Sequence, residues 1–224
     1  APSGASNNNV AIGSQALKAS GTKSNNVAVG YEALKTFNIT TGSGFNTAVG
    51  SVAGTALTTG TNNTLIGGSS GTAATTATGI TAVGKGSLLS DTTGSDNTAV
   101  GYRAMESNTT ASYNTATGKS ALFANTTGAS NTAIGKSALA ANTTGGANTA
   151  VGRDALLSNT TGDYNTAVGQ NALDANTTAD NNTAVGQAAL GLNTTGNNNT
   201  AVGSGALDSN TTADSNTAVG FNVL

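Results

Sequence analysis

The chain of 224 residues contains no cysteine and no histidine, and it has a single proline. It therefore lacks thiol nucleophiles, disulfides, Cys/His zinc sites and histidine-based acid–base catalysis. The only glutamates, Glu32 and Glu106, give very weak support to the paired carboxylates of a glycosidase. No constellation of nucleophile, base and orienting group is present, so the sequence predicts no enzymatic activity, no cofactor and no bound metal.

Charged and aromatic side chains are also scarce. Charged residues make up 8% of the chain, the net charge is −2, and aromatic residues make up 4%. The low positive charge argues against nucleic acid as a partner and against an electrostatic membrane patch. No run approaches the roughly 18 apolar residues of a membrane span, and the few aromatics argue against a compact globular core.

Repetition is what the chain has in abundance. The five-residue core N-T-A-V-G at residues 97–101 recurs to the end of the chain. It begins again at Asn114, Asn131, Asn148, Asn165, Asn182, Asn199 and Asn216, and looser copies begin at Asn9, Asn26, Asn46, Asn63 and Ile80. Every step is 17 residues except the step of 20 from Asn26 to Asn46. A fixed period of this kind indicates stacked structural repeats.

The consensus reads N-T-A-V-G-x-x-A-L-x-x-N-T-T-G-x-x, and its positions are numbered 1 to 17 below. It is too short for a helix pair or a propeller blade. Positions 1 to 4 have the alternation of a short strand, and a second strand is predicted at about positions 7 to 10, with turns at the glycine and asparagine corners. The sequence therefore predicts an all-β chain, a parallel β-solenoid of about thirteen 17-residue coils. It forms one domain over residues 1–224, in which residues 1–8 are a partial coil.

Coils stacked about 4.8 Å apart place equivalent side chains one above another. We expect buried apolar ladders at Val100, Val151, Val168, Val185, Leu122, Leu139, Leu156 and Leu173, and a hydrogen-bonded ladder at Asn125, Asn142, Asn159 and Asn176. Valine and leucine bury little apolar surface in each coil, whereas 17 residues lose conformational entropy when the coil becomes ordered. A further apolar interface is therefore expected, and self-association is its simplest source.

The cores at residues 9–13 (N-V-A-I-G) and 26–30 (N-V-A-V-G) resemble the head repeat of trimeric autotransporter adhesins, the YadA-like head. Phage tail fibres carry similar repeats. The resemblance spans residues 9–224 and rests on these five-residue cores, and the period of 17 departs from the family's shorter coil. It implies a left-handed parallel β-roll, three chains around one axis, and adhesion to host or matrix surfaces.

These features together predict an extracellular or cell-surface fibre protein with a structural or adhesive function. The expected partners are further copies of the chain and a host-surface or matrix ligand. The copies would form a homotrimer or a head-to-tail filament. The filament is suggested because Leu224 falls at position 9 and Ala1 at position 10, so that two copies continue in register. The alternatives are a solenoid that binds glycan or ice, and a receptor-binding tail fibre of a virion.

Four sets of residues are candidate sites. The motif N-x-[ST] marks Asn38, Asn108, Asn125 and Asn142 as glycosylation acceptors, although at position 12 it also reads as a corner ladder. The threonines at position 2 are an ice-binding face if they point outward, and otherwise a packed strand position. The aspartates Asp163, Asp180 and Asp214 at position 16, and Asp174 and Asp208 at position 10, read as solvated carboxylates. The aromatic residues Tyr31, Tyr102, Phe221, Phe45, Tyr113 and Tyr164 bind sugars or a receptor, or they fill a trimer interface.

Overall fold

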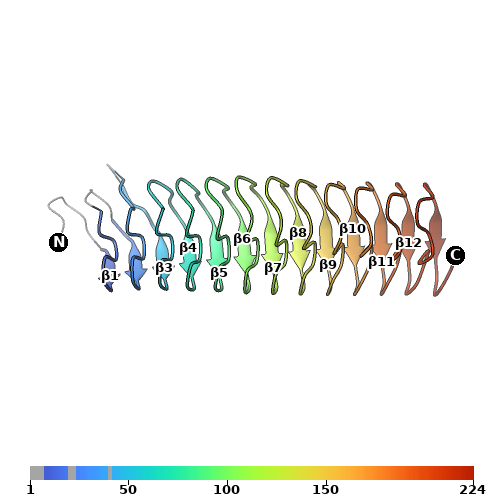
Figure 1. Cartoon of the computed structure of the whole chain (residues 1–224), viewed down its shortest axis with the longest axis horizontal. Coiled ribbons are helices and arrows are strands. Elements are labelled where there is room, and N and C mark those ends of the chain that lie inside the picture. The colour runs from blue at the N-terminus through green and yellow to red at the C-terminus, as the bar shows by residue number, and fades with distance from the viewer. Residues whose placement is uncertain (1–7, 20–23, 40–41) are drawn as a thin grey trace. The chain divides into compact units, whose positions relative to one another are not determined.

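The computed structural model describes residues 8–19, 24–39 and 42–224. It is all-β: thirteen parallel strands of three residues stack as a β-solenoid with about 17 residues per turn (Figure 1). The predicted parallel β-solenoid is thereby confirmed, whereas the left-handed winding stays a prediction. The chain forms two compact units, Ala1–Ser112 and Tyr113–Leu224, and both repeat the same coil.

The strands begin at position 2 of each coil. In the described part of the first unit they are β1 (Val10–Ile12), β2 (Val27–Val29), β3 (Thr47–Val49), β4 (Thr64–Ile66), β5 (Thr81–Val83) and β6 (Thr98–Val100). In the second unit they are β7 (Thr115–Thr117), β8 (Thr132–Ile134), β9 (Thr149–Val151), β10 (Thr166–Val168), β11 (Thr183–Val185), β12 (Thr200–Val202) and β13 (Thr217–Val219).

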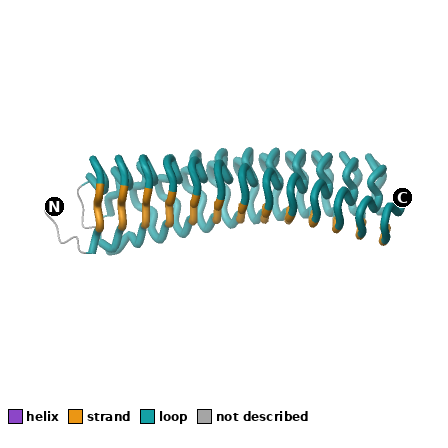
Figure 2. The backbone as a smooth tube through the Cα atoms, turned by 90° about the horizontal axis from the view of Figure 1, so that it is seen from below, coloured by secondary structure: helices purple, strands orange, loops and turns teal. Residues whose placement is uncertain are grey.

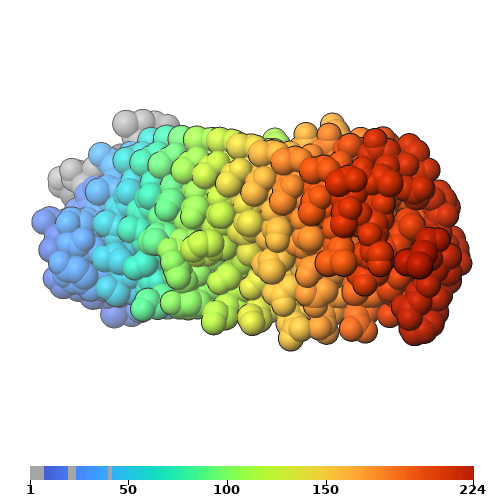
Figure 3. Space-filling model, turned by 45° about the vertical axis from the view of Figure 1, so that its right-hand side comes forward, coloured from blue at the N-terminus to red at the C-terminus, as the bar shows by residue number. Residues whose placement is uncertain are grey.

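Within each unit every strand pairs with the next in exact repeat register, as Thr166 with Thr183 and Val168 with Val185. Figure 2 shows these strands side by side on one face of the coils. In the space-filling view the coils of the second unit follow one another as successive layers (Figure 3).

The valine ladder faces outward, contrary to the expectation that it is buried. Val100, Val168 and Val185 are each 36% exposed, and Val151 is half-buried. In a strand of three residues only the middle side chain points to the interior, and here it is the alanine at position 3, fully buried as in Ala167. The valines stack in register, but they form a surface column and contribute little to the core.

The second strand predicted at positions 7 to 10 is absent from the described coils, which turn there instead. In the coil that begins at Asn148, Asp154 and Leu156 have φ values of 59° and 51°, in the left-handed region. Ala155 and Leu156 are adjacent and both are 0% exposed. Two neighbouring strand residues would point to opposite faces, so burying both requires this turned backbone. The turn still joins coils, because the Leu156 N–H donates to the Ala172 carbonyl at 3.0 Å.

The leucines at position 9 fill the interior opposite the strands. The leucines Leu122, Leu139, Leu156 and Leu173 are all 0% exposed. The glycine at position 5 allows the coils to approach: at Gly169, φ is 139° and a Cβ atom would overlap the carbonyl of Gly186 in the next coil. The core of the coils that contain these leucines thus consists of small residues, one leucine and buried asparagines.

Candidate functional site

Two columns of asparagine side chains run through the interior of the second unit, at positions 1 and 12. At position 12, Nδ2 of Asn142 donates to Oδ1 of Asn125 in the preceding coil and to the Gly145 carbonyl of its own coil, both at 2.8 Å. Asn159 and Asn176 repeat this pattern, with Nδ2–Oδ1 distances of 2.9 and 2.8 Å to the preceding asparagine. These four asparagines are 0% exposed and link the coils through the core.

The asparagines at position 1 form the second column, which the sequence analysis did not identify. Oδ1 of Asn148 accepts the backbone N–H of Asn165 in the next coil at 2.9 Å, and its Nδ2 donates to the Gly162 carbonyl at 2.8 Å. The Gly162 carbonyl also accepts Nδ2 of Asn159 at 3.0 Å. Both columns therefore meet at the carbonyl of position 15, and buried amides with partners of this kind stabilise the stack.

Burial of the position-12 asparagines also bears on the predicted glycosylation acceptors. Asn108, Asn125 and Asn142 are 0% exposed, so the folded coil gives a glycan no access to their amides, contrary to the motif. Asn38 is exposed, but Thr40 of its motif lies outside the described residues. The asparagines at position 12 are thus corner-ladder residues.

Asp91 replaces the asparagine of position 12 in the coil that begins at Ile80. It is 0% exposed, its Oδ1 accepts the Gly94 N–H at 2.8 Å, and its Oδ2 has no hydrogen-bond partner among the described residues. Burial raises the pKa of this carboxyl from 3.8 to about 7, against the smaller opposing effects of the Gly94 N–H and the side chains of Asn108 and Asn97. Asp91 is therefore a titratable group in the core of the first unit.

The aspartates at position 16 accept backbone hydrogen bonds: Asp163 and Asp180 are half-buried rather than freely solvated, whereas Asp214 is exposed. Oδ1 of Asp163 accepts the Gly146 N–H at 2.6 Å, and Oδ1 of Asp180 accepts the Asp163 N–H at 2.7 Å. Oδ1 of Asp214 accepts the Asn197 N–H at 2.6 Å in the same way. Each carboxylate satisfies a backbone donor of the preceding coil, so its first role is structural.

The outer face of the strands, formed by positions 2 and 4, is an extended uncharged surface of each unit. The threonines at position 2 are half-buried on this face, except Thr217, which is exposed. At position 4 of the second unit, Ile134 is 42% exposed and Val202 is 36% exposed. We call the surface made by positions 2 and 4 the sheet face. No charged residue occupies either position in any coil.

The aromatic residues at positions 6 and 17 point to solvent. Tyr102 and Tyr31 are 48% and 51% exposed, and Tyr113 and Tyr164 are 67% and 66% exposed. Tyr113 and Tyr164 lie on a different face of the coil from the sheet face, at position 17. Their exposure fits a contact with a ligand or another chain, as the sequence analysis considered.

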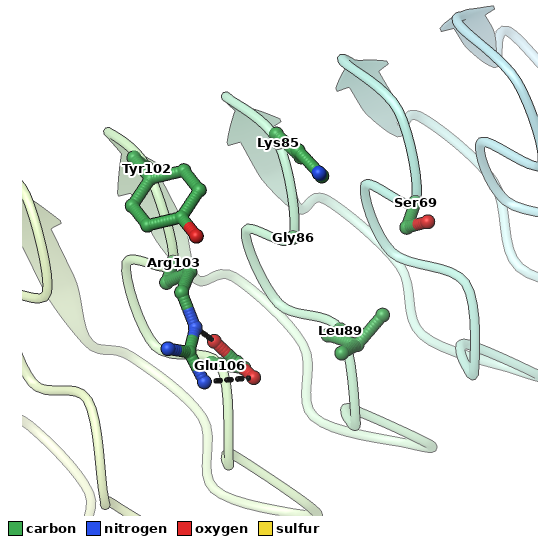
Figure 4. A pocket seen from close by; sticks show the side chains of 7 residues that line it. All are labelled: Ser69, Lys85, Gly86, Leu89, Tyr102, Arg103 and Glu106. Carbon is green, nitrogen blue, oxygen red and sulfur yellow. Dashed lines mark hydrogen bonds and ion pairs between the residues drawn. The ribbon is translucent and has the colours of Figure 1, made fainter.

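A shallow hollow in the first unit collects side chains from three successive coils (Figure 4). Ser69 and Lys85 lie on one side, Leu89 lines the base, and Tyr102 and the Arg103–Glu106 ion pair lie on the other side. The hydrogen bonds that Arg103 donates to the Glu106 carboxylate raise the pKa of Arg103 further, so this group stays charged. The Lys85 amine and the Ser69 hydroxyl have no partner among the described residues.

Basic residues occupy position 6 of three consecutive coils in the second unit. Its lysines and arginine are Lys119, Lys136 and Arg153, all exposed and all at this position of three consecutive coils. Nε of Arg153 lies 3.2 Å from the Asp154 carboxylate, whereas no acidic partner is found for Lys119 or Lys136 among the described residues. We call the surface made by position 6 the basic edge.

The described residues contain no group of three or more histidine, cysteine, aspartate or glutamate side chains placed to hold a metal ion. They also contain no helix with the length and apolar character of a membrane span. No protein-family model, curated protein or solved structure matches the chain.

Proposed function

We propose that this chain is a structural or adhesive fibre protein of the extracellular space or cell surface, and that its copies associate through the sheet face. The observation that carries the proposal is the column of exposed apolar side chains at position 4. In the second unit it continues over consecutive coils at Ile134, Val168, Val185 and Val202, which are 36–42% exposed, and Val151, which is half-buried. Continuous apolar surfaces mark interaction sites in soluble proteins.

A second copy of the same chain is the partner that fits this face. Both copies present equivalent side chains at every coil, about 4.8 Å apart, so one register aligns the whole column. The absence of charge at positions 2 and 4 removes electrostatic repulsion between two such faces. The apolar area grows with each added coil, which favours association of long repeat arrays over that of single coils.

The test places charge on the sheet face without changing the core. We expect the double variant Val151→Glu and Val185→Glu to shift the self-association equilibrium toward the monomer, because facing carboxylates would repel at alternate coils. The matched control, Thr161→Glu and Thr195→Glu, adds the same charge at exposed position 14 of alternate coils and should associate as the parent does. Sedimentation velocity over a concentration series measures the difference. A monomeric parent, or equal association of both variants, would refute the proposal.

A further inference from the structure

The basic edge brings together charges that repel one another. In the second unit, Lys119, Lys136 and Arg153 follow at steps of 17 residues, so their backbones lie about 4.8 Å apart in adjacent coils. Like charges at such spacing disfavour the folded coil unless a counter-charge is present. Asp154 partners Arg153, but the two lysines lack an acidic partner within the part of the chain that the structure describes.

Acidic and basic residues occupy different positions of the repeat in the second unit. The second unit carries six aspartates, and none of them occupies position 6; all its basic residues do. Charges of the two signs are thus separated onto different columns in a chain whose net charge is only −2. A random surface of low charge would intersperse the signs, whereas a regular row of cations matches a regular row of anions.

The hollow of the first unit shows what else the basic edge offers. Lys85 occupies position 6 there and supplies an amine that no other described residue partners. Tyr102 occupies position 6 of the next coil and is 48% exposed. Ser69 adds a hydroxyl within the same hollow. An exposed aromatic ring, a hydroxyl and a cation are the groups that contact the face, the hydroxyls and the acid group of a charged sugar.

We infer that the basic edge of the second unit binds a linear acidic polysaccharide that carries a carboxylate or sulfate on successive sugars, and that the hollow of the first unit, where position 6 supplies the base Lys85, binds one such acidic sugar. The polymer lies along the stack, and one coil step corresponds to about one sugar residue of an extended chain. The anions contact the cations of position 6, while Tyr102 packs on a sugar ring in the first unit. This inference deepens the proposed adhesive function by assigning a ligand class to a surface other than the sheet face.

The experiment measures binding of the full chain to polygalacturonate, to dextran sulfate and to neutral dextran at low salt. We expect binding to an acidic polymer and none to dextran. The first two polymers distinguish carboxylates from sulfates as the anion. The double variant Lys119→Gln and Lys136→Gln should weaken binding by about 25-fold, at about fivefold for each cation near an anionic surface. Circular dichroism checks that the variant remains folded.

Two matched variants distinguish binding at position 6 from a general effect of net charge. Gln170→Lys extends the basic edge by one coil and should strengthen binding about fivefold. Thr178→Lys adds the same charge to the same coil at exposed position 14 and should leave the affinity unchanged. Equal gains from both variants, or no binding of the parent to either acidic polymer, would overturn the inference. Sedimentation in the same buffer reports self-association separately, so failure here is distinguishable from failure of the sheet-face proposal.

Discussion

Replacing Asp91 by asparagine should stabilise the first unit at neutral pH and remove a pH dependence. Asparagine is the residue of position 12 in the coils from Asn97 onward, and its Nδ2 can donate to the Gly94 carbonyl as Asn125 donates to Gly128. The aspartate offers only acceptors when ionised, and its buried Oδ2 has no hydrogen-bond partner among the residues that the structure describes. The substitution therefore supplies a donor and removes a buried charge.

The size of the effect follows from the pKa. A rise from 3.8 to about 7 is about three units. Folding therefore disfavours the ionised form of Asp91 relative to its protonated form by about 4 kcal/mol. Because the folded pKa lies above the unfolded value, the native state binds more protons than the unfolded state between these values. The contribution of the protonated Asp91 carboxyl to the free energy of unfolding is fully present below about pH 4. It falls as the pH rises toward 7 and is lost above pH 7.

Urea unfolding followed by circular dichroism, from pH 4 to pH 8, measures this dependence in the parent and in Asp91→Asn. We expect the variant to gain most at pH 8 and to show a flatter profile. Other carboxylates titrate equally in both proteins and cancel in the comparison. The reverse change in the second unit, Asn142→Asp, should introduce a falling profile there. Profiles of the parent and Asp91→Asn that run parallel across the whole range would refute the reasoning.

Two further predictions concern the core of the second unit. Leu156 is 0% exposed, and Leu156→Ala should lower the free energy of unfolding by about 2–5 kcal/mol. Val168→Ala on the sheet face should lower it by less than about 1 kcal/mol. Urea unfolding compares the two variants, and equal losses would contradict the assignment of valine to the surface. Asn159→Ala removes the donor to Asn142 Oδ1 and to the Gly162 carbonyl, and it should lower the free energy of unfolding by about 2–5 kcal/mol. The control Thr161→Ala, at an exposed residue, should be nearly neutral. A thermal melt in which both variants match the parent would disprove a stabilising ladder.

The period and the strand near the start of each coil could be predicted from the sequence, because equivalent residues must stack once the repeat is a coil, whereas the second predicted strand is a turn. The direction of the side chains was harder to infer. Valine is the larger apolar residue, so it was assigned to the core, yet the alternation of the strand buries Ala167 and exposes Val168. The adjacent pair Ala155 and Leu156 held the missing signal, since two neighbouring buried residues are incompatible with a strand.

The basic edge could have been found from the sequence alone. Lys119, Lys136 and Arg153 recur at the period of the repeat, although position 6 is variable over the chain as a whole. The hydrogen bonds of Asp163 and Asp180 were not accessible in this way. They depend on the turn that aims each carboxylate at the preceding coil, and composition does not encode that direction.

The coils that look degenerate in sequence are those in which the core changes its chemistry. Position 12 holds the buried side chains of Phe37, Leu57 and Ala74 in three coils of the first unit, and it becomes asparagine from Asn108 onward. Asp91 lies between these two kinds of core. Its carboxyl is close enough to the Asn108 side chain for the amide to lower its pKa, so it offers the first amide of the column an acceptor that alanine or leucine could not supply. Asp91 supplies the acceptor that this position needs, at the cost of burying a carboxyl whose pKa is thereby raised to about 7, whereas an asparagine would supply the same acceptor and also a donor to the Gly94 carbonyl.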